Sequence, residues 1–187
     1  MVRELTRLSS LGSPWASAVL GYLALMPGAD GIRELDRAIE LCKPHADRSD
    51  AYSLWVLAWA LLHKGEVNLA ASTMQRAAVQ EFPPALLDFA SFIWRGWGIK
   101  NPKIADALAR VRRAEKVGHK GAWVWRSQYY RSGKFGIIRR FLGYLLMPLA
   151  WSRWAIGIWT DPLSCQVLSF QWSKRPLLQL EKQTFTR

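Results

Sequence analysis

The stretch PALLDFASFIWRGWGIKNPKIADALARVRRAEKVGHKGA, residues 84–122, decides the fold of this chain. It is followed by AWVWRSQYYRSGKFG, residues 122–136, and the two segments match when Ala85 is aligned with Ala122. The offset is 37 residues throughout, and the matched pairs are small (Ala90 and Ser127), bulky (Ile93 and Tyr130) and glycine (Gly96 and Gly133). A fixed period of this length predicts stacked helical repeats.

The glycines of GWG (96–98) indicate where the first of these units turns. A tight turn between helices often needs a positive φ, which glycine adopts without steric cost. We therefore expect a helical hairpin over 84–118 with its turn near 96–101.

The preceding segment, residues 51–82, predicts another helical hairpin. Its apolar residues recur at intervals of three and four until KGE (64–66) interrupts them, and a second such face follows. The small residues Ala58 and Ala70 would let the two helices approach closely. Pro83 and Pro84 would end the second helix, because proline lacks the backbone donor.

Residues 14–43 predict one more hairpin, with a helix over 15–26, a break at PGADG (27–31) and a helix over 32–43. Asp30 is a plausible N-cap, and Pro44 would end the second helix. A cleavable signal peptide is the alternative for 15–26, but Glu4 lies in its basic region and no clear cleavage site follows. Strand-type alternation is missing from the sequence, so the fold class expected is all-α.

The repeats resemble known families. Residues 51–82 are similar to a tetratricopeptide repeat, and 84–118 resemble its relative, the Sel-one-like repeat, through the following positions: Ala85, Ala90, Ile93, Gly96, Trp97, Gly98, Ile99, Ala107, Ala114 and Gly118. The resemblance implies a solenoid of stacked antiparallel hairpins that serves as a scaffold. We expect a repeat domain over 1–136 and a basic, tryptophan-rich C-terminal region over 137–187.

Charge divides the chain into two halves. The net charge is +12, and residues 101–187 hold sixteen basic against four acidic residues, whereas residues 1–100 hold ten of each. Such a basic half suits an anionic lipid surface, nucleic acid or an acidic protein. The two cysteines, Cys42 and Cys165, form no CxxC motif, so neither a disulfide framework nor a zinc site is indicated.

The segment FLGYLLMPLAWSRWAIGIW, residues 141–159, has three possible placements: across a membrane, in a membrane interface, or in a soluble core. Pro148 and Arg153 disfavour a span, and the interfacial placement is preferred, with Pro148 splitting the segment into two short helices. The residues expected to associate with the membrane are Arg139, Arg140, Leu142, Leu145, Leu146, Trp151, Arg153, Trp154 and Trp159.

Catalytic and metal-binding motifs are missing from the sequence, and His45, His63 and His119 lack ligand spacing. We therefore expect that the chain is not an enzyme and needs no cofactor. A repeat solenoid binds partners on its free surfaces, and tryptophan is favoured at such contacts. The candidates for partner binding are Trp55, Trp59, Trp94, Trp97, Trp123 and Trp125.

These features together predict a bacterial adaptor that binds a protein, with an integral membrane protein among the candidates, at the cytoplasmic side of the inner membrane. A role in an envelope or exopolysaccharide machine is what the family resemblance implies. The alternatives are an immunity or inhibitor protein for a toxin, and a basic nucleic-acid-binding protein that stacks bases on the aromatic residues at 123, 125, 129 and 130.

Overall fold

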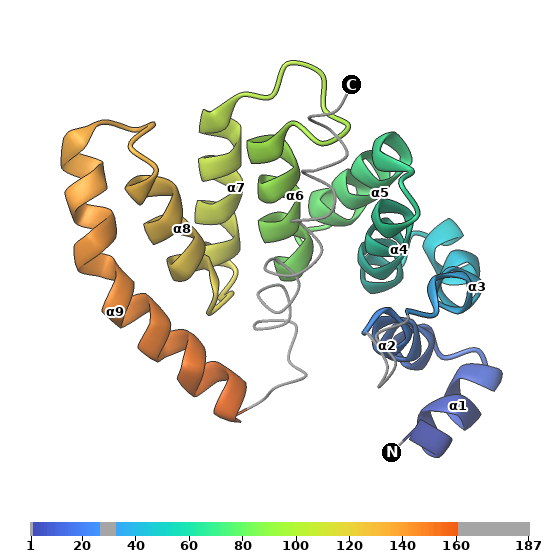
Figure 1. The fold of residues 1–187 in the computed structure, drawn as a ribbon. Helices are drawn as coiled ribbons and strands as arrows, with labels where there is room; N and C mark the ends of the chain where they lie inside the picture. The colour runs from blue at the N-terminus through green and yellow to red at the C-terminus, as the bar shows by residue number, and fades with distance from the viewer. Residues whose placement is uncertain (1, 27–32, 161–187) are drawn as a thin grey trace.

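The computed structural model of the chain describes residues 2–26 and 33–160, which form helices and turns and no β-strand. The helices follow one another along an arc (Figure 1). They are α1 (Val2–Ser10), α2 (Pro14–Leu25), α3 (Leu35–Asp47), α4 (Ala51–His63), α5 (Val67–Val79), α6 (Pro83–Arg95), α7 (Ile104–Lys116), α8 (Ala122–Arg131) and α9 (Ile137–Thr160).

Successive helices pair into the hairpins α2–α3, α4–α5, α6–α7 and α8–α9, and each hairpin packs on the next. This arrangement confirms the predicted all-α solenoid. The turns predicted near 64–66 and 96–101 lie between α4 and α5 and between α6 and α7, while the break predicted at 27–31 falls outside the described residues.

The aligned small residues occupy equivalent places in the solenoid. Ala85 and Ala90 of α6 and Ala122 and Ser127 of α8 are all fully buried. The 37-residue offset therefore relates the first helices of two successive hairpins. Ala58 and Ala70 are likewise fully buried between α4 and α5, as expected of positions that set the distance between two helices.

Left-handed residues end the helices of the repeats. Gly65 follows α4 with φ of 86°, and its N–H donates to the Leu62 carbonyl while Glu66 N–H donates to Leu61. This pair of backbone bonds satisfies carbonyls that a helix end would otherwise leave free. Gly96 does the same after α6, with φ of 72°.

The N-terminal part differs from the prediction in two ways. Helix α1 was not predicted, and α3 runs to Asp47 instead of ending before Pro44. Proline at 44 removes one backbone hydrogen bond, but the buried side chains of His45 and Ala46 keep the last turn helical. Helix α3 begins at Leu35 rather than at 32, and Asp30, the predicted N-cap, lies outside the described residues.

Pro148 does not split the C-terminal apolar segment. Helix α9 is continuous from Ile137 to Thr160, with Pro148 inside it and exposed. Packing on α8 holds the helix together on both sides of the proline, because Gly143 before it lies against Ser127 and Ala150 after it packs with Val124. The domain boundary expected at residue 136 falls in the turn between α8 and α9.

Replacing Gly98 by alanine should destabilise the protein more than replacing Gly65 by alanine. Both glycines have positive φ (60° and 86°), but a Cβ at Gly98 would lie 2.6 Å from the Val67 carbonyl oxygen, whereas a Cβ at Gly65 meets nothing within 4 Å. Each variant loses about 1 kcal/mol from the left-handed backbone, and Gly98→Ala loses roughly 1–3 kcal/mol more from overpacking. Urea unfolding measures both; equal losses would show that the close approach at Gly98 has no energetic weight.

Candidate functional site

Two of the tryptophans expected to bind a partner bind a buried carboxyl group instead. The indole N–H groups of Trp55 and Trp59 both donate to Oδ2 of Asp88, at 2.6 and 2.9 Å. Trp55, Trp59 and Asp88 are 0%, 3% and 1% exposed, so a partner cannot reach these two rings. Desolvation raises the pKa of Asp88 to about 7, against the opposing effect of the two indole hydrogen bonds.

The other four candidate tryptophans are buried or covered by a cation. Trp125 is buried, whereas Trp94, Trp97 and Trp123 are half-buried. The ring–cation distances are 4.4 Å from Trp94 to Lys134, 5.0 Å from Trp97 to Arg95, and 4.5 and 4.9 Å from Trp123 to Arg126 and Arg153. These contacts stabilise the chain internally, and they explain how Arg153 is accommodated in an apolar segment.

The aromatic residues that would stack nucleic acid bases lie mostly in the core. Trp125, Tyr129 and Tyr130 are buried, and the ring of Trp123 lies against two arginines. Residues 122–131 therefore present no exposed row of aromatic rings.

The three histidines and Cys42 lie in or beside the packed interior of the solenoid. His45 Nε2 lies 3.1 Å from the Ser17 hydroxyl, and His119 Nδ1 accepts from Gly121 N–H. Burial lowers the pKa of His63 to about 4 and raises the pKa of the Cys42 thiol to about 12. In the part of the chain that the structure describes, no three metal-binding side chains come together.

Helix α9 presents its small residues to the rest of the protein. Gly143, Ala150 and Gly157 are buried and seven residues apart, so they form one stripe along the helix. A Cβ at Gly143 would lie 2.7 Å from the Ser127 carbonyl oxygen of α8. Beside this stripe, Trp151 and Trp154 pack in a T-shaped pair, with ring centroids 5.3 Å apart, against Val124 and Ala150.

The large apolar residues of α9 point the other way. We call the outer face of α9 the stripe formed by Ile138, Phe141, Leu145, Leu149, Ile156 and Trp159, whose spacing of three, four and seven places them on one side of the helix. Their exposure ranges from 60% at Leu149 to 90% at Trp159, and the stripe contains no charge. Within residues 2–26 and 33–160, no helix combines the length and apolarity that crossing a membrane requires.

The predicted membrane-associating residues divide among three places on α9. Leu145 and Trp159 belong to the outer face and Leu142 flanks it, whereas Leu146, Trp151 and Trp154 are half-buried. Arg139 and Arg140 are exposed near the N-terminal end of the helix. The prediction missed Ile138, Phe141, Leu149 and Ile156, although their spacing opposite the stripe of Gly143, Ala150 and Gly157 could have identified them.

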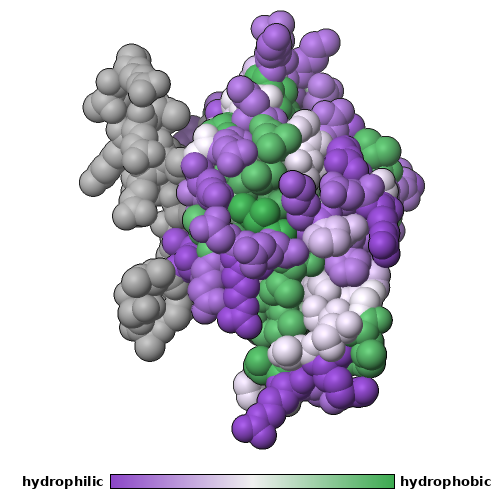
Figure 2. Space-filling model, turned by 90° about the vertical axis from the view of Figure 1, so that its right-hand side faces the viewer, coloured by the Kyte–Doolittle hydropathy of each residue, from purple (hydrophilic) through white to green (hydrophobic). Residues whose placement is uncertain are grey.

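The opposite end of the solenoid has a different surface. Helix α1 buries Leu5 and exposes Arg3, Glu4 and Arg7, of which Glu4 and Arg7 form an ion pair at 2.6 Å. Figure 2, which faces this end of the molecule, shows hydrophilic side chains over much of the surface with a hydrophobic band between them. The N-terminal end therefore carries a polar helix, whereas the C-terminal end of the described solenoid presents the outer face of α9.

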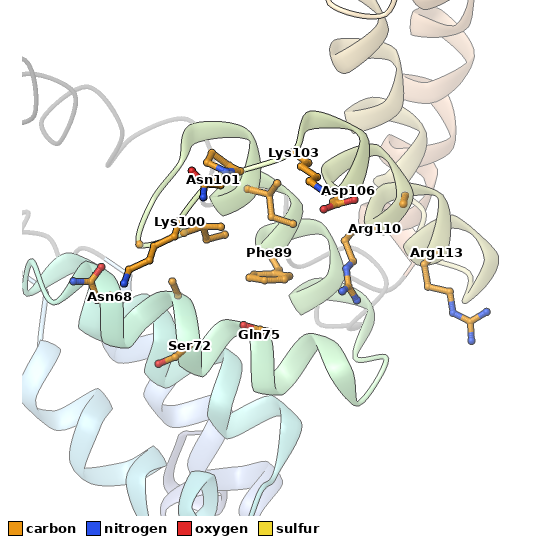
Figure 3. Close-up of a pocket in the computed structure, with 16 residues that line it drawn as sticks. Asn68, Ser72, Gln75, Phe89, Lys100, Asn101, Lys103, Asp106, Arg110 and Arg113 are labelled. Carbon is orange, nitrogen blue, oxygen red and sulfur yellow. The ribbon is translucent and has the colours of Figure 1, made fainter.

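A groove lies between α5, α6 and α7, with a volume of about 630 Å³. We call it the α5–α7 groove. Figure 3 shows Phe89 in its middle, polar side chains of α5 on one side, and the 100–103 segment with α7 on the other. Its polar and charged lining residues are Asn68, Ser72, Gln75, Lys100, Asn101, Lys103, Asp106, Arg110 and Arg113.

Comparison with solved structures identifies the fold. A Sel1 repeat protein from Oxalobacter formigenes matches 80% of this chain with a TM-score of 0.58 and 20% identity. The protective antigen c5321 of uropathogenic Escherichia coli, which displays an SLR fold, matches 86% with a TM-score of 0.59 and 19% identity. The chain has the Sel1-repeat fold.

The Sel1-repeat chain spans less than half of either of these proteins, 44% of the first and 34% of the second. No protein-family model matches the sequence, and no curated protein matches it. The resemblance noted in the sequence is thus confirmed at the level of the fold.

Raising the pH should destabilise the wild-type protein more than an Asp88→Asn variant. The pKa of Asp88 rises from 3.8 to about 7 on folding, so its contribution to stability is complete below about pH 4 and is lost as the pH passes about 7. Between about pH 5 and pH 8 the wild type should lose on the order of 2–3 kcal/mol relative to the variant, which keeps an acceptor oxygen for the indoles. Urea unfolding at both pH values tests this, and parallel pH profiles would contradict it.

Proposed function

We propose that this chain is a non-enzymatic adaptor whose repeats bind a protein while the outer face of α9 lies in the surface of a membrane. The proposed location is the cytoplasmic side of a bacterial inner membrane, with peripheral or monotopic attachment. The observation that carries the proposal is the outer face of α9, six exposed apolar side chains that the exposed Ser152 alone interrupts between Leu149 and Ile156.

The length of this apolar face supports the proposal. The outer face alone exposes six large apolar side chains along α9, a helix of 24 residues or roughly 36 Å, whereas α1 exposes Arg3, Glu4 and Arg7. An exposed apolar patch of this kind is typical of a surface that binds a membrane or another protein.

Lipid is the cover that suits the residues around the stripe. Arg139 and Arg140 are exposed near one end of the helix, and basic residues are in excess through 101–187. Cationic side chains beside an apolar helix face attract anionic headgroups. Trp159 and Tyr144 are exposed by 90% and 48%, and both residue types favour the headgroup level.

The protein-binding part of the proposal rests on the repeat fold. Stacked hairpins offer extended surfaces, and repeat solenoids generally use such surfaces to bind other proteins. The histidines considered in the sequence contact other residues of the solenoid. His45, for example, lies within hydrogen-bond distance of the Ser17 hydroxyl. The partner that we propose is a protein of the bacterial envelope machinery, with an integral membrane protein as the first candidate because α9 would place the repeats beside it.

Substituting Leu145 by glutamate should release the protein from anionic vesicles. Leu145 is 74% exposed in the middle of the outer face, so the variant removes apolar area that would enter the bilayer and adds a repelled charge. We expect at least an about tenfold loss of binding in co-sedimentation with phosphatidylglycerol-containing vesicles. The matched control is Leu69→Glu on α5, since Leu69 is also exposed, at 52%, and lies away from α9.

Salt separates this proposal from binding to nucleic acid. Apolar burial of the outer face does not depend on screening, so part of the wild-type binding to vesicles should persist at high salt. Binding through phosphates alone would fall steeply with salt. Equal vesicle binding by Leu145→Glu and Leu69→Glu would overturn the membrane assignment and leave the protein-binding assignment in place.

A further inference from the structure

The α5–α7 groove has a rigid frame. Gly98 brings the loop 96–103 so close to α5 that a Cβ there would lie 2.6 Å from the Val67 carbonyl oxygen and 2.8 Å from the Ala71 Cβ. This contact fixes the segment that carries Lys100 and Lys103 along one side of the groove (Figure 3). Phe89 and Ile93 of α6, both buried, provide an apolar floor.

The cations of the groove are largely available to a ligand. Arg113 forms an ion pair with Glu81, but Lys100, Lys103 and Arg110 form no ion pair with any residue the structure describes. Arg110 is held over the ring of Phe89, with 5.6 Å between its guanidinium carbon and the ring centroid. Asp106 is the one acidic residue among the described residues that line the groove, so the lining keeps a net positive charge.

The facing side of the groove offers amides rather than charges. Asn68, Ser72 and Gln75 lie at intervals of four and three on α5, on one exposed face of the helix. The side-chain amides of Asn68 and Gln75 form no hydrogen bond with described residues. An amide both donates and accepts, as a peptide backbone does. From Asn68 to Gln75 is roughly 10 Å along the helix, the length of about three residues of extended chain.

We propose that the α5–α7 groove binds an extended, acidic segment of a protein partner. The amides of Asn68 and Gln75 bond the backbone of the segment, Lys100, Lys103 and Arg110 bind its carboxylates, and Phe89 with Ile93 contacts an apolar side chain between them. Charge-assisted hydrogen bonds to carboxylates supply most of the specificity. The inference rests on the proposed protein-binding function and names the chemistry of the partner.

The test uses a phage-displayed library of random dodecapeptides panned against the full chain. We expect peptides rich in Asp and Glu with an interspersed apolar residue to be enriched. The best peptide is then synthesised with a fluorescent label, and its Kd is measured by anisotropy. Lys103→Glu should raise this Kd by at least about tenfold. Lys116 is exposed at the other end of α7 and outside the groove, so Lys116→Glu should leave the Kd within about twofold.

A second variant tests the groove without changing charge. Ser72 is exposed on α5, so Ser72→Trp fills the groove at little cost to folding and should abolish peptide binding. Equal effects of Lys103→Glu and Lys116→Glu, or full binding by Ser72→Trp, would overturn the assignment in favour of general electrostatic attraction. A single-stranded oligonucleotide that binds and is lost in Lys103→Glu, while no acidic peptide is enriched, would overturn it in favour of nucleic acid.

These outcomes are separable from failure of the proposed function. Enrichment of non-acidic peptides whose Kd is unchanged in Lys103→Glu would overturn the groove assignment and leave the adaptor function standing. Vesicle binding is a separate readout, because Lys103→Glu leaves the outer face of α9 intact and should reduce vesicle binding far less than Leu145→Glu.

Discussion

Close approach of helices through small side chains is the constraint on which this structure depends. Each contact between neighbouring helices contains fully buried alanine or serine, as at Ala58, Ala90 and Ser127. Glycines mark close contacts, since a Cβ at Gly98 or Gly143 would lie within 2.7 Å of a carbonyl oxygen on the facing helix, and a Cβ at Gly21 would lie 2.6 Å from the Cys42 sulfur. Dense packing of this kind tolerates little added volume, so the small residues fix the spacing of the whole solenoid.

The same constraint gives α9 its unusual character. Gly143 and Ala150 pack against α8, and the six large apolar residues of the outer face lie on the opposite side of the helix. An ordinary surface helix buries its large apolar residues and exposes polar ones. Helix α9 instead exposes six large apolar side chains along one face, while Leu146, Trp151 and Trp154 are half-buried beside the buried glycine and alanine residues.

Several polar and aromatic groups inside the solenoid contact one another. Trp55 and Trp59 share Asp88, and Lys134 covers Trp94. Buried polar groups require such partners, which accounts for several residues that looked functional in the sequence. The two surfaces that we propose for recognition are the α5–α7 groove, where Lys100 and Lys103 form no ion pair with any described residue, and the outer face of α9.

The sequence alone determined the helical class and the hairpins α2–α3, α4–α5 and α6–α7, because apolar period, glycine and proline act locally, but it did not predict that α8 and α9 pair in the same way. The 37-residue match between α6 and α8 was visible for the same reason. Only the tertiary structure decided which tryptophans are buried and that α3 and α9 continue through Pro44 and Pro148. It also decided that the cations of residues 100–113 and the amides of α5 line opposite sides of one groove. Those outcomes depend on contacts between residues far apart in the sequence, such as Trp55 with Asp88, and a local pattern does not specify which distant residue a side chain will contact.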